Sequence, residues 1–110
     1  MPLTKADQFK PKEIRLAEIA KALSHPARIA LLNAIAKRND CVCGELVELL
    51  PLAQATVSQH LKELKRVGLI KGEIDGARSC YCINPEAVGE AQAMLGHFLA
   101  NVQACCSTTN

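Results

Sequence analysis

The stretch that decides the fold is residues 53–70, AQATVSQHLKELKRVGLI. Val57, Leu61 and Leu64 recur at the three- and four-residue spacing of one buried helix face, and Gly68 follows as a residue suited to ending a helix. The other face carries side chains that can contact base edges or phosphates near the helix start: Gln54, Thr56, Ser58, Gln59 and Lys62. This pattern predicts a helix that is buried on one side and reads DNA with the other.

Helical patterns precede this stretch. Apolar residues at helical spacing run over residues 12–25 and again over residues 26–36, with Pro26 suited to the first turn of the second helix. A short third helix over residues 46–50 ends at Pro51. A short helix, a turn and a helix with a polar start have the sequence form of a helix-turn-helix.

A strand pattern follows Gly68 directly. Two short apolar runs flank Asp75 and Gly76, a hairpin turn signal, and Arg78 beside it can reach a minor groove. Asn84 and Pro85 then begin a last helix with a long apolar stripe. We therefore expect a mainly α fold with a small β-hairpin wing, a winged helix-turn-helix, whose last helix partly meets another subunit.

Composition and charge narrow the function classes. The chain has 110 residues, of which 49% are hydrophobic and 3% aromatic, so it suits one domain with an aliphatic, helical core and excludes a multidomain enzyme. The net charge of +2 is too small for nucleic-acid binding by bulk charge, whereas residues 54–71 alone carry four basic side chains against one acidic one. No catalytic constellation, secretory signal or membrane span is evident, so we expect a cytoplasmic protein that is not an enzyme and has no membrane partner. We divide the chain into a loose arm (1–11), a DNA-binding and dimerisation domain (12–104) and a tail (105–110).

The chemistry of the chain resides in six cysteines: Cys41, Cys43, Cys80, Cys82, Cys105 and Cys106. A disulfide scaffold needs an oxidising compartment and a chain too small for its own core, and we expect neither condition to hold. The clustered thiols therefore indicate soft metal or metalloid ligands, or redox chemistry.

Cys41 and Cys43 form the sharpest of these features. On a helix, residues two apart point about 200° from each other, whereas in extended backbone both lie on one side, so we expect the pair just before or at the start of the third helix. Unpaired backbone N–H groups there favour the thiolate, a soft donor. The absence of paired His or carboxylate ligands nearby argues against a zinc or nickel site of nitrogen and oxygen donors. Cys80 and Cys82 also share one strand face, either as small packing residues or as half of a four-cysteine zinc site.

These segments together resemble the ArsR/SmtB family of arsenic- and metal-responsive winged helix-turn-helix repressors, over roughly residues 16–85. The matching segments are ALSHPARIALL (22–32), CVCGEL (41–46), TVSQHLKELKRVGLI (56–70) and GEIDGARSCYCI (72–83). The resemblance implies a homodimer that sits on an inverted-repeat operator in double-stranded DNA until an inducer binds. It also implies that Ser58 and His60 belong to the DNA-reading helix, although the position of His60 beside Leu61 suits a packing residue equally well.

The resemblance also names an inducer. CVCGEL is similar to the motif with which arsenic-responsive members hold As(III) or Sb(III) through thiolates. A cysteine that some members carry is replaced by Leu46, so a trigonal site needs a third sulfur, and we expect it from Cys105 or Cys106. Two sulfurs alone suffice for a monosubstituted trivalent organoarsenical.

The sequence therefore predicts a repressor that leaves its operator when Cys41 and Cys43, with a C-terminal thiol, capture trivalent arsenic or antimony, and that holds no organic cofactor. A redox-responsive repressor and a Cd-, Pb- or Zn-responsive one on the same scaffold stay open. A small thiol-disulfide enzyme is the weaker alternative, since Cys-x-Cys lacks the Cys-x-x-Cys spacing.

Overall fold

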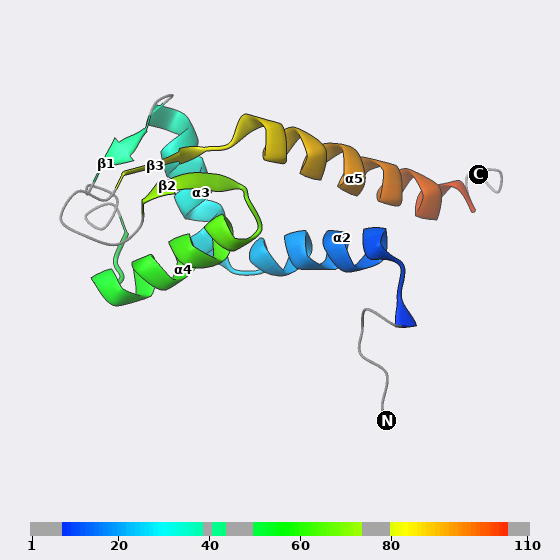
Figure 1. The fold of residues 1–110 in the computed structure, drawn as a ribbon, viewed down its shortest axis with the longest axis horizontal. Coiled ribbons are helices and arrows are strands. Elements are labelled where there is room, and N and C mark those ends of the chain that lie inside the picture. The colour runs from blue at the N-terminus through cyan, green and yellow to red at the C-terminus, as the bar shows by residue number, and fades with distance from the viewer. Residues whose placement is uncertain (1–7, 39–40, 44–49, 74–79, 106–110) are drawn as a thin grey trace.

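The structure is a computed structural model that describes residues 8–38, 41–43, 50–73 and 80–105. Its helices and strands follow the order that the sequence predicted, with one additional short strand (Figure 1). They are α2 (Pro11–Ala22), α3 (Pro26–Arg38), β1 (Val42–Cys43), α4 (Gln54–Arg66), β2 (Ile70–Glu73), β3 (Cys80–Ile83) and α5 (Pro85–Ala104).

The predicted helix ends are confirmed. α3 begins at Pro26, and α2 begins at Pro11, one residue before the predicted start. Gly68 follows α4 with a φ of 89°, the left-handed backbone that glycine tolerates. At the start of α5, the Asn84 side chain accepts a hydrogen bond from the Ala87 backbone N–H at 3.4 Å. The predicted third helix lies largely outside the described residues.

The sheet has three strands in the order β1-β3-β2, all antiparallel, so it is larger than the predicted hairpin. In β1, Val42 pairs with Tyr81 and Cys43 with Cys80; in β2, Lys71 pairs with Cys82 and Gly72 with Tyr81. The extra strand is the chain between α3 and the helix-turn-helix. Consequently, the segment that carries the first cysteine pair lies against the strand that carries the second.

The core is aliphatic, as the composition predicts. Its largest fully buried side chains come from α2, α3, α4 and β2, and they are Ile19, Leu31, Ile35, Leu64, Ile70 and Val57. Tyr81, 2% exposed, brings an aromatic ring into this cluster from β3. Burial of each such side chain stabilises the fold by about 1.5–3 kcal/mol.

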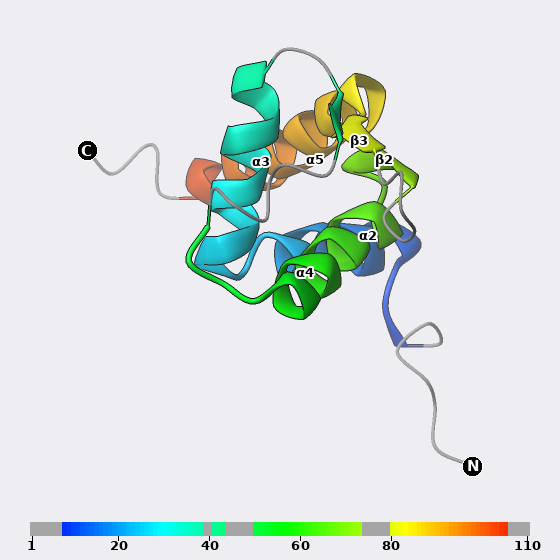
Figure 2. The ribbon, with the colours of Figure 1, turned by 90° about the vertical axis from the view of Figure 1, so that its left-hand side faces the viewer.

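Helices α2 and α5 run side by side away from the sheet (Figures 1 and 2). On α5, Phe98 is 46% exposed, Leu99 59% and Val102 55%, so much of the predicted apolar stripe lies on the surface of this chain. None of the helices in the described segments is both long enough and apolar enough to cross a membrane.

Candidate functional site

The face of α4 opposite the core has the predicted DNA-reading composition. Val57, Leu61 and Leu64 are buried, which fixes the rotation of the helix about its axis. The polar side chains predicted to contact DNA are exposed at Gln54, Thr56, Gln59 and Lys62, and half-buried at Ser58. Ala53 precedes the helix and supplies no side-chain cap, so the first backbone N–H groups of α4 are left for solvent or for a phosphate oxygen.

His60 lies on the flank of α4 that contacts the beginning of α3. Its ring centroid is 4.4 Å from that of His25, and its Nδ1 is 3.4 Å from an Arg28 guanidinium nitrogen. Burial, followed by the charges of His25 and Arg28, lowers the pKa of His60. Because a guanidinium can only donate, Nδ1 of His60 is the acceptor in this contact. His60 therefore packs between two helices and helps to hold α4 against α3.

The positive charge predicted for residues 54–71 does not form one patch. Arg66 forms ion pairs with Glu18 of α2 at 2.6 Å and with Glu63 at 2.7 Å. Hydrogen bonds to Arg66 lower the pKa of both carboxyl groups, and the same bonds raise the pKa of Arg66. Lys71 lies on β2, next to Cys82 of β3. Among the described residues, the exposed basic side chains of α4 are Lys62, Lys65 and Arg66, and Arg66 is held in ion pairs. Arg78 falls outside the described residues.

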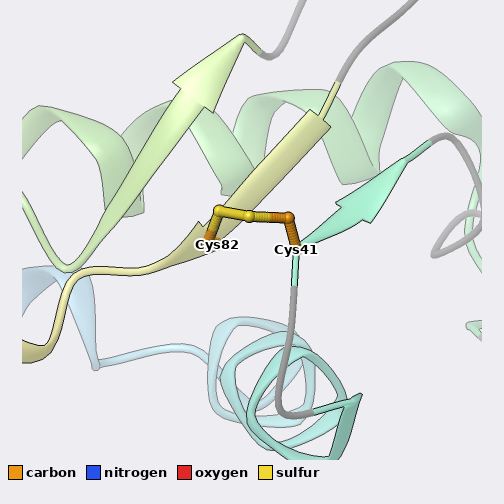
Figure 3. The surroundings of a disulfide bond; sticks show 2 residues. All are labelled: Cys41 and Cys82. Atoms are coloured by element: carbon orange, nitrogen blue, oxygen red, sulfur yellow. A yellow bond between two sulfur atoms is a disulfide. The ribbon is translucent and has the colours of Figure 1, made fainter.

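The cysteines meet across β1 and β3. A disulfide joins Cys41 to Cys82, with a Cα–Cα distance of 4.4 Å (Figure 3). Because Val42 and Tyr81 pair with their side chains buried in the core, Cys41, Cys80 and Cys82 lie toward the opposite face of the sheet. Cys80 is also disulfide-bonded.

The expectation that the chain has no disulfide framework is therefore wrong for this structure. The physical reason is the register of β1 on β3, which places directly opposed Cα atoms within the range that a disulfide requires. The expectation of extended backbone at the first cysteine pair is confirmed: Val42 is buried and Cys41 exposed, as alternation along a strand demands. The same register places the Cys41–Cys43 segment beside the Cys80–Cys82 segment, as a four-cysteine site would require.

The structure does not bring the C-terminal thiol to this cluster within one chain. Cys105 is exposed and follows the last turn of α5. A helix of this length spans about 30 Å at 1.5 Å per residue. It begins directly after β3, so its C-terminal end, which Cys105 follows, lies far from β1 (Figure 1). Cys106 falls outside the described residues.

A pocket of about 470 Å³ adjoins the disulfide. Of the described residues that line it, Cys41, Cys82 and Lys71 are polar, and the others are apolar: Ile35, Ala36, Ile83 and Pro85. Sequence reasoning missed this pocket because its walls come from α3, β2, β3 and the start of α5. The sequence pattern predicts that Lys71 and Cys82 lie on neighbouring strands of one hairpin. Only the pairing register of β2 and β3 shows that the two residues are directly opposed.

Comparison with known proteins agrees with these features. Residues 25–71 match the model of a family described as "Bacterial regulatory protein, arsR family". The chain is 32% identical over 93 residues to the HTH-type transcriptional regulator YgaV of Escherichia coli strain K12, covering 84% of this chain and 94% of that one. It is 42% identical over 73 residues to the HTH-type transcriptional repressor SmtB of Mycobacterium tuberculosis, covering 64% and 53% respectively. The crystal structure of M. tuberculosis Rv0081 matches with a TM-score of 0.61 and 31% identity, over 87% of this chain and 96% of that one.

Proposed function

Because the chain belongs to the arsR family of bacterial regulatory proteins, and so is a DNA-binding transcriptional regulator rather than an enzyme, we propose that it is a repressor induced by trivalent arsenic or antimony. The inducer binds thiolates at Cys41 and Cys43 together with Cys82 of the neighbouring strand. One observation carries this proposal: Cys41 and Cys82 lie at bonding distance of each other, from two segments on opposite sides of the helix-turn-helix in the chain.

The chemistry of the cluster suits a soft ion. Thiolates bind soft, thiophilic ions in preference to hard ones. Lys71 is the cross-strand neighbour of Cys82 and lines the same pocket, so a basic side chain shares the wall that carries the two sulfurs. Once the disulfide is reduced, the sulfurs of Cys41 and Cys82 are two donors on one wall of a pocket that is open to an incoming ligand.

The position of the cluster explains how binding reaches DNA. β1 leads into the helix-turn-helix, β3 belongs to the wing, and α4 packs against β2 of the same sheet. An ion that binds sulfurs of β1 and β3 fixes the distance between these elements and so changes how α4 is presented to the major groove. A coupling free energy of about 1–3 kcal/mol gives roughly 5- to 150-fold weaker operator binding.

Binding to an inverted-repeat operator requires two copies of α4. The exposed apolar side chains of α5, among them Phe98, Leu99 and Val102, are the surface on which a second copy packs. In a homodimer the two α4 helices occupy successive major grooves, about 34–36 Å apart, on an inverted repeat. The bases are read by Gln54, Thr56, Ser58 and Gln59, the phosphates by Lys62, and the minor groove by Arg78.

The test uses an operator selected from random duplex DNA with the purified full chain, kept reduced by a phosphine. Arsenite should release this operator from the unmodified protein. The Cys41→Ser and Cys82→Ser variants should bind the operator with the same affinity but respond to arsenite at least about tenfold less, since one sulfur–arsenic bond is lost. A normal arsenite response in both variants would refute the site.

A second candidate function rests on the disulfide itself. Oxidation of the Cys41 and Cys82 thiols by a peroxide forms the S–S bond, and the two electrons and two protons reduce the peroxide O–O bond. The regulator would then respond to redox state. Release of the operator by peroxide, with no effect of arsenite under strong reductant, would favour this function over the first.

A further inference from the structure

We propose that Arg15 of α2 is a positioning residue for DNA binding, because its hydrogen bond to the carbonyl that ends α4 fixes the angle at which α4 lies in the major groove. This inference rests on the proposed reading role of α4 and is independent of the inducer. Arg15 acts from a neighbouring helix and is not part of the reading face itself.

The C-terminal end of α4 is closed by two kinds of donor. Leu69 closes it locally, because its backbone N–H donates to the Leu64 carbonyl at 3.1 Å. The carbonyl of Val67, the residue that follows the helix, accepts a hydrogen bond from Nη2 of Arg15 at 2.8 Å, across 52 residues of sequence. A cation at the negative C-terminal end of a helix is favourable, and a charged donor makes a strong hydrogen bond. The partly buried Arg15 guanidinium therefore ties the end of α4 to α2.

A second contact joins the same two helices one turn further along α2. Glu18 lies three residues after Arg15, so both side chains share a face of α2. The Glu18 carboxylate accepts a hydrogen bond from Nη2 of Arg66 at 2.6 Å, and Glu63 accepts from the same nitrogen at 2.7 Å. One contact runs from α2 to the backbone that ends α4, and the other runs from α4 to a side chain of α2. The crossing of the two helices is therefore fixed at two points.

Helix α2 is also anchored away from these contacts. Leu16 shares an apolar groove of about 420 Å³ with Met94 and Phe98 of α5, and the two helices run side by side (Figure 1). Ile19 is only 1% exposed and belongs to the core. Because α2 is held by α5 and the core, it is a fixed support against which Arg15 can orient α4.

The length of α4 makes its first turn sensitive to a contact at its other end. The helix has 13 residues and spans about 20 Å. The side chains proposed to read bases lie in its first half, at Gln54, Thr56, Ser58 and Gln59. A tilt of about 5° about the C-terminal end would move the first turn by about 1.7 Å, which exceeds the spread of about 0.5 Å in hydrogen-bond lengths. Flexible lysine side chains can follow a phosphate over that distance, so loss of the Arg15 contact should weaken base contacts more than phosphate contacts.

The experiment measures operator discrimination, which is the ratio of the affinities of the full chain for a selected operator and for a scrambled duplex of the same composition. Arg15→Met removes the donor and keeps an unbranched side chain, so it should lower this ratio about tenfold, mainly through weaker operator binding. Arg15→Lys retains a donor and should give a ratio between those of Arg15→Met and the unmodified protein. The matched control Lys37→Met removes the same charge from an exposed position on α3 and should leave the ratio unchanged.

Two further measurements separate positioning from other roles of Arg15. The slope of log affinity against log salt for the scrambled duplex should not change in Arg15→Met, because a positioning residue neutralises no phosphate. All affinities are measured well below the melting temperature of each variant, so that a loss of stability alone does not change operator discrimination. If Arg15→Met does not fold, Glu18→Gln carries the test, with an expected loss of about twofold because that ion pair is half-exposed.

The outcomes distinguish this inference from its premise. A selective fall in operator discrimination that Arg15→Lys partly restores supports the positioning role. An unchanged ratio in folded Arg15→Met, or in Glu18→Gln where Arg15→Met does not fold, overturns it, as does an equal fall in affinity for both duplexes. Gln59→Ala tests the premise separately, since an unchanged ratio in that variant would overturn the reading role of α4 itself.

Discussion

Replacing Gly72 by alanine should destabilise the wing and, with it, the cysteine cluster. Gly72 has a φ of 121°, and a Cβ there would lie 2.2 Å from the Cys80 carbonyl oxygen and 2.9 Å from the Tyr81 Cα. The unfavourable backbone contributes roughly 1–3 kcal/mol and the collision with rigid backbone a further 1–3 kcal/mol, so the free energy of unfolding should fall by about 2–6 kcal/mol. Since small domains are stable by only about 5–15 kcal/mol, urea unfolding followed by circular dichroism will resolve this change.

Two other glycines provide matched controls. Gly68 has a φ of 89°, but a Cβ there would meet only the Ala87 Cβ at 3.8 Å, so Gly68→Ala should cost about 1–2 kcal/mol, from the backbone alone. Gly89 lies within α5 with nothing within 4 Å of an added Cβ, so Gly89→Ala should stabilise the protein by about 0.5–1 kcal/mol. We therefore predict that substitution by alanine destabilises the protein most at Gly72, less at Gly68, and not at all at Gly89. If Gly72→Ala unfolds within about 1 kcal/mol of the unmodified protein, the close approach of β2 to β3 does not hold the wing.

Three further predictions concern α4 and its supports. Lys62→Ala should weaken binding about equally for all DNA sequences and should reduce the slope of log affinity against log salt by about 1. The control Lys37→Ala, at the C-terminal end of α3, should change neither the affinity nor the slope. Fluorescence anisotropy over a salt series measures both. The pKa of His60 is lowered on folding, so the unfolded chain binds a proton more readily and the free energy of unfolding should decline as the pH falls below about 6.5. The decline should be shallower in His60→Gln. An identical pH profile of the two proteins in urea titrations would contradict the lowered pKa of His60. Arg66 also lowers the pKa of Glu18 on folding, so this carboxylate contributes stability above its unfolded pKa that is lost as the pH falls through the lower folded value. In Arg66→Gln, the melting temperature should therefore fall less steeply with pH below about 4.5. An unchanged pH dependence would show that the ion pair does not contribute to stability.

Local chemistry explains why the helices and their ends could be predicted. The spacing of Val57, Leu61 and Leu64 sets the buried face of α4, because side chains three and four apart lie on one side of any helix. Gly68 and Asn84 end and begin helices through backbone and side-chain properties that depend on few neighbours. The exposed polar face of α4 follows from the same periodicity, since burial of one side of a helix exposes the other.

Contacts between segments that are distant in the sequence could not be predicted from the sequence pattern. The Cys41–Cys82 bond needs β1 to pair with β3 across 41 residues, and a shift of one residue would turn each cysteine to the other face. Periodicity placed Arg66 on an exposed face of α4, but its pairing with Glu18 depends on how α2 crosses that face.

The sequence by itself determined that this chain is a winged helix-turn-helix with an amphipathic helix whose polar face is exposed and with two strand-spaced cysteine pairs, because periodicity, caps and side-chain chemistry are local properties. The tertiary structure alone decided that the two pairs meet, that the thiol of Cys105 lies far from them in the same chain, and that a pocket with an apolar wall adjoins them. Contacts between distant segments depend on the packing of the whole core, which fixes strand register and helix crossing together.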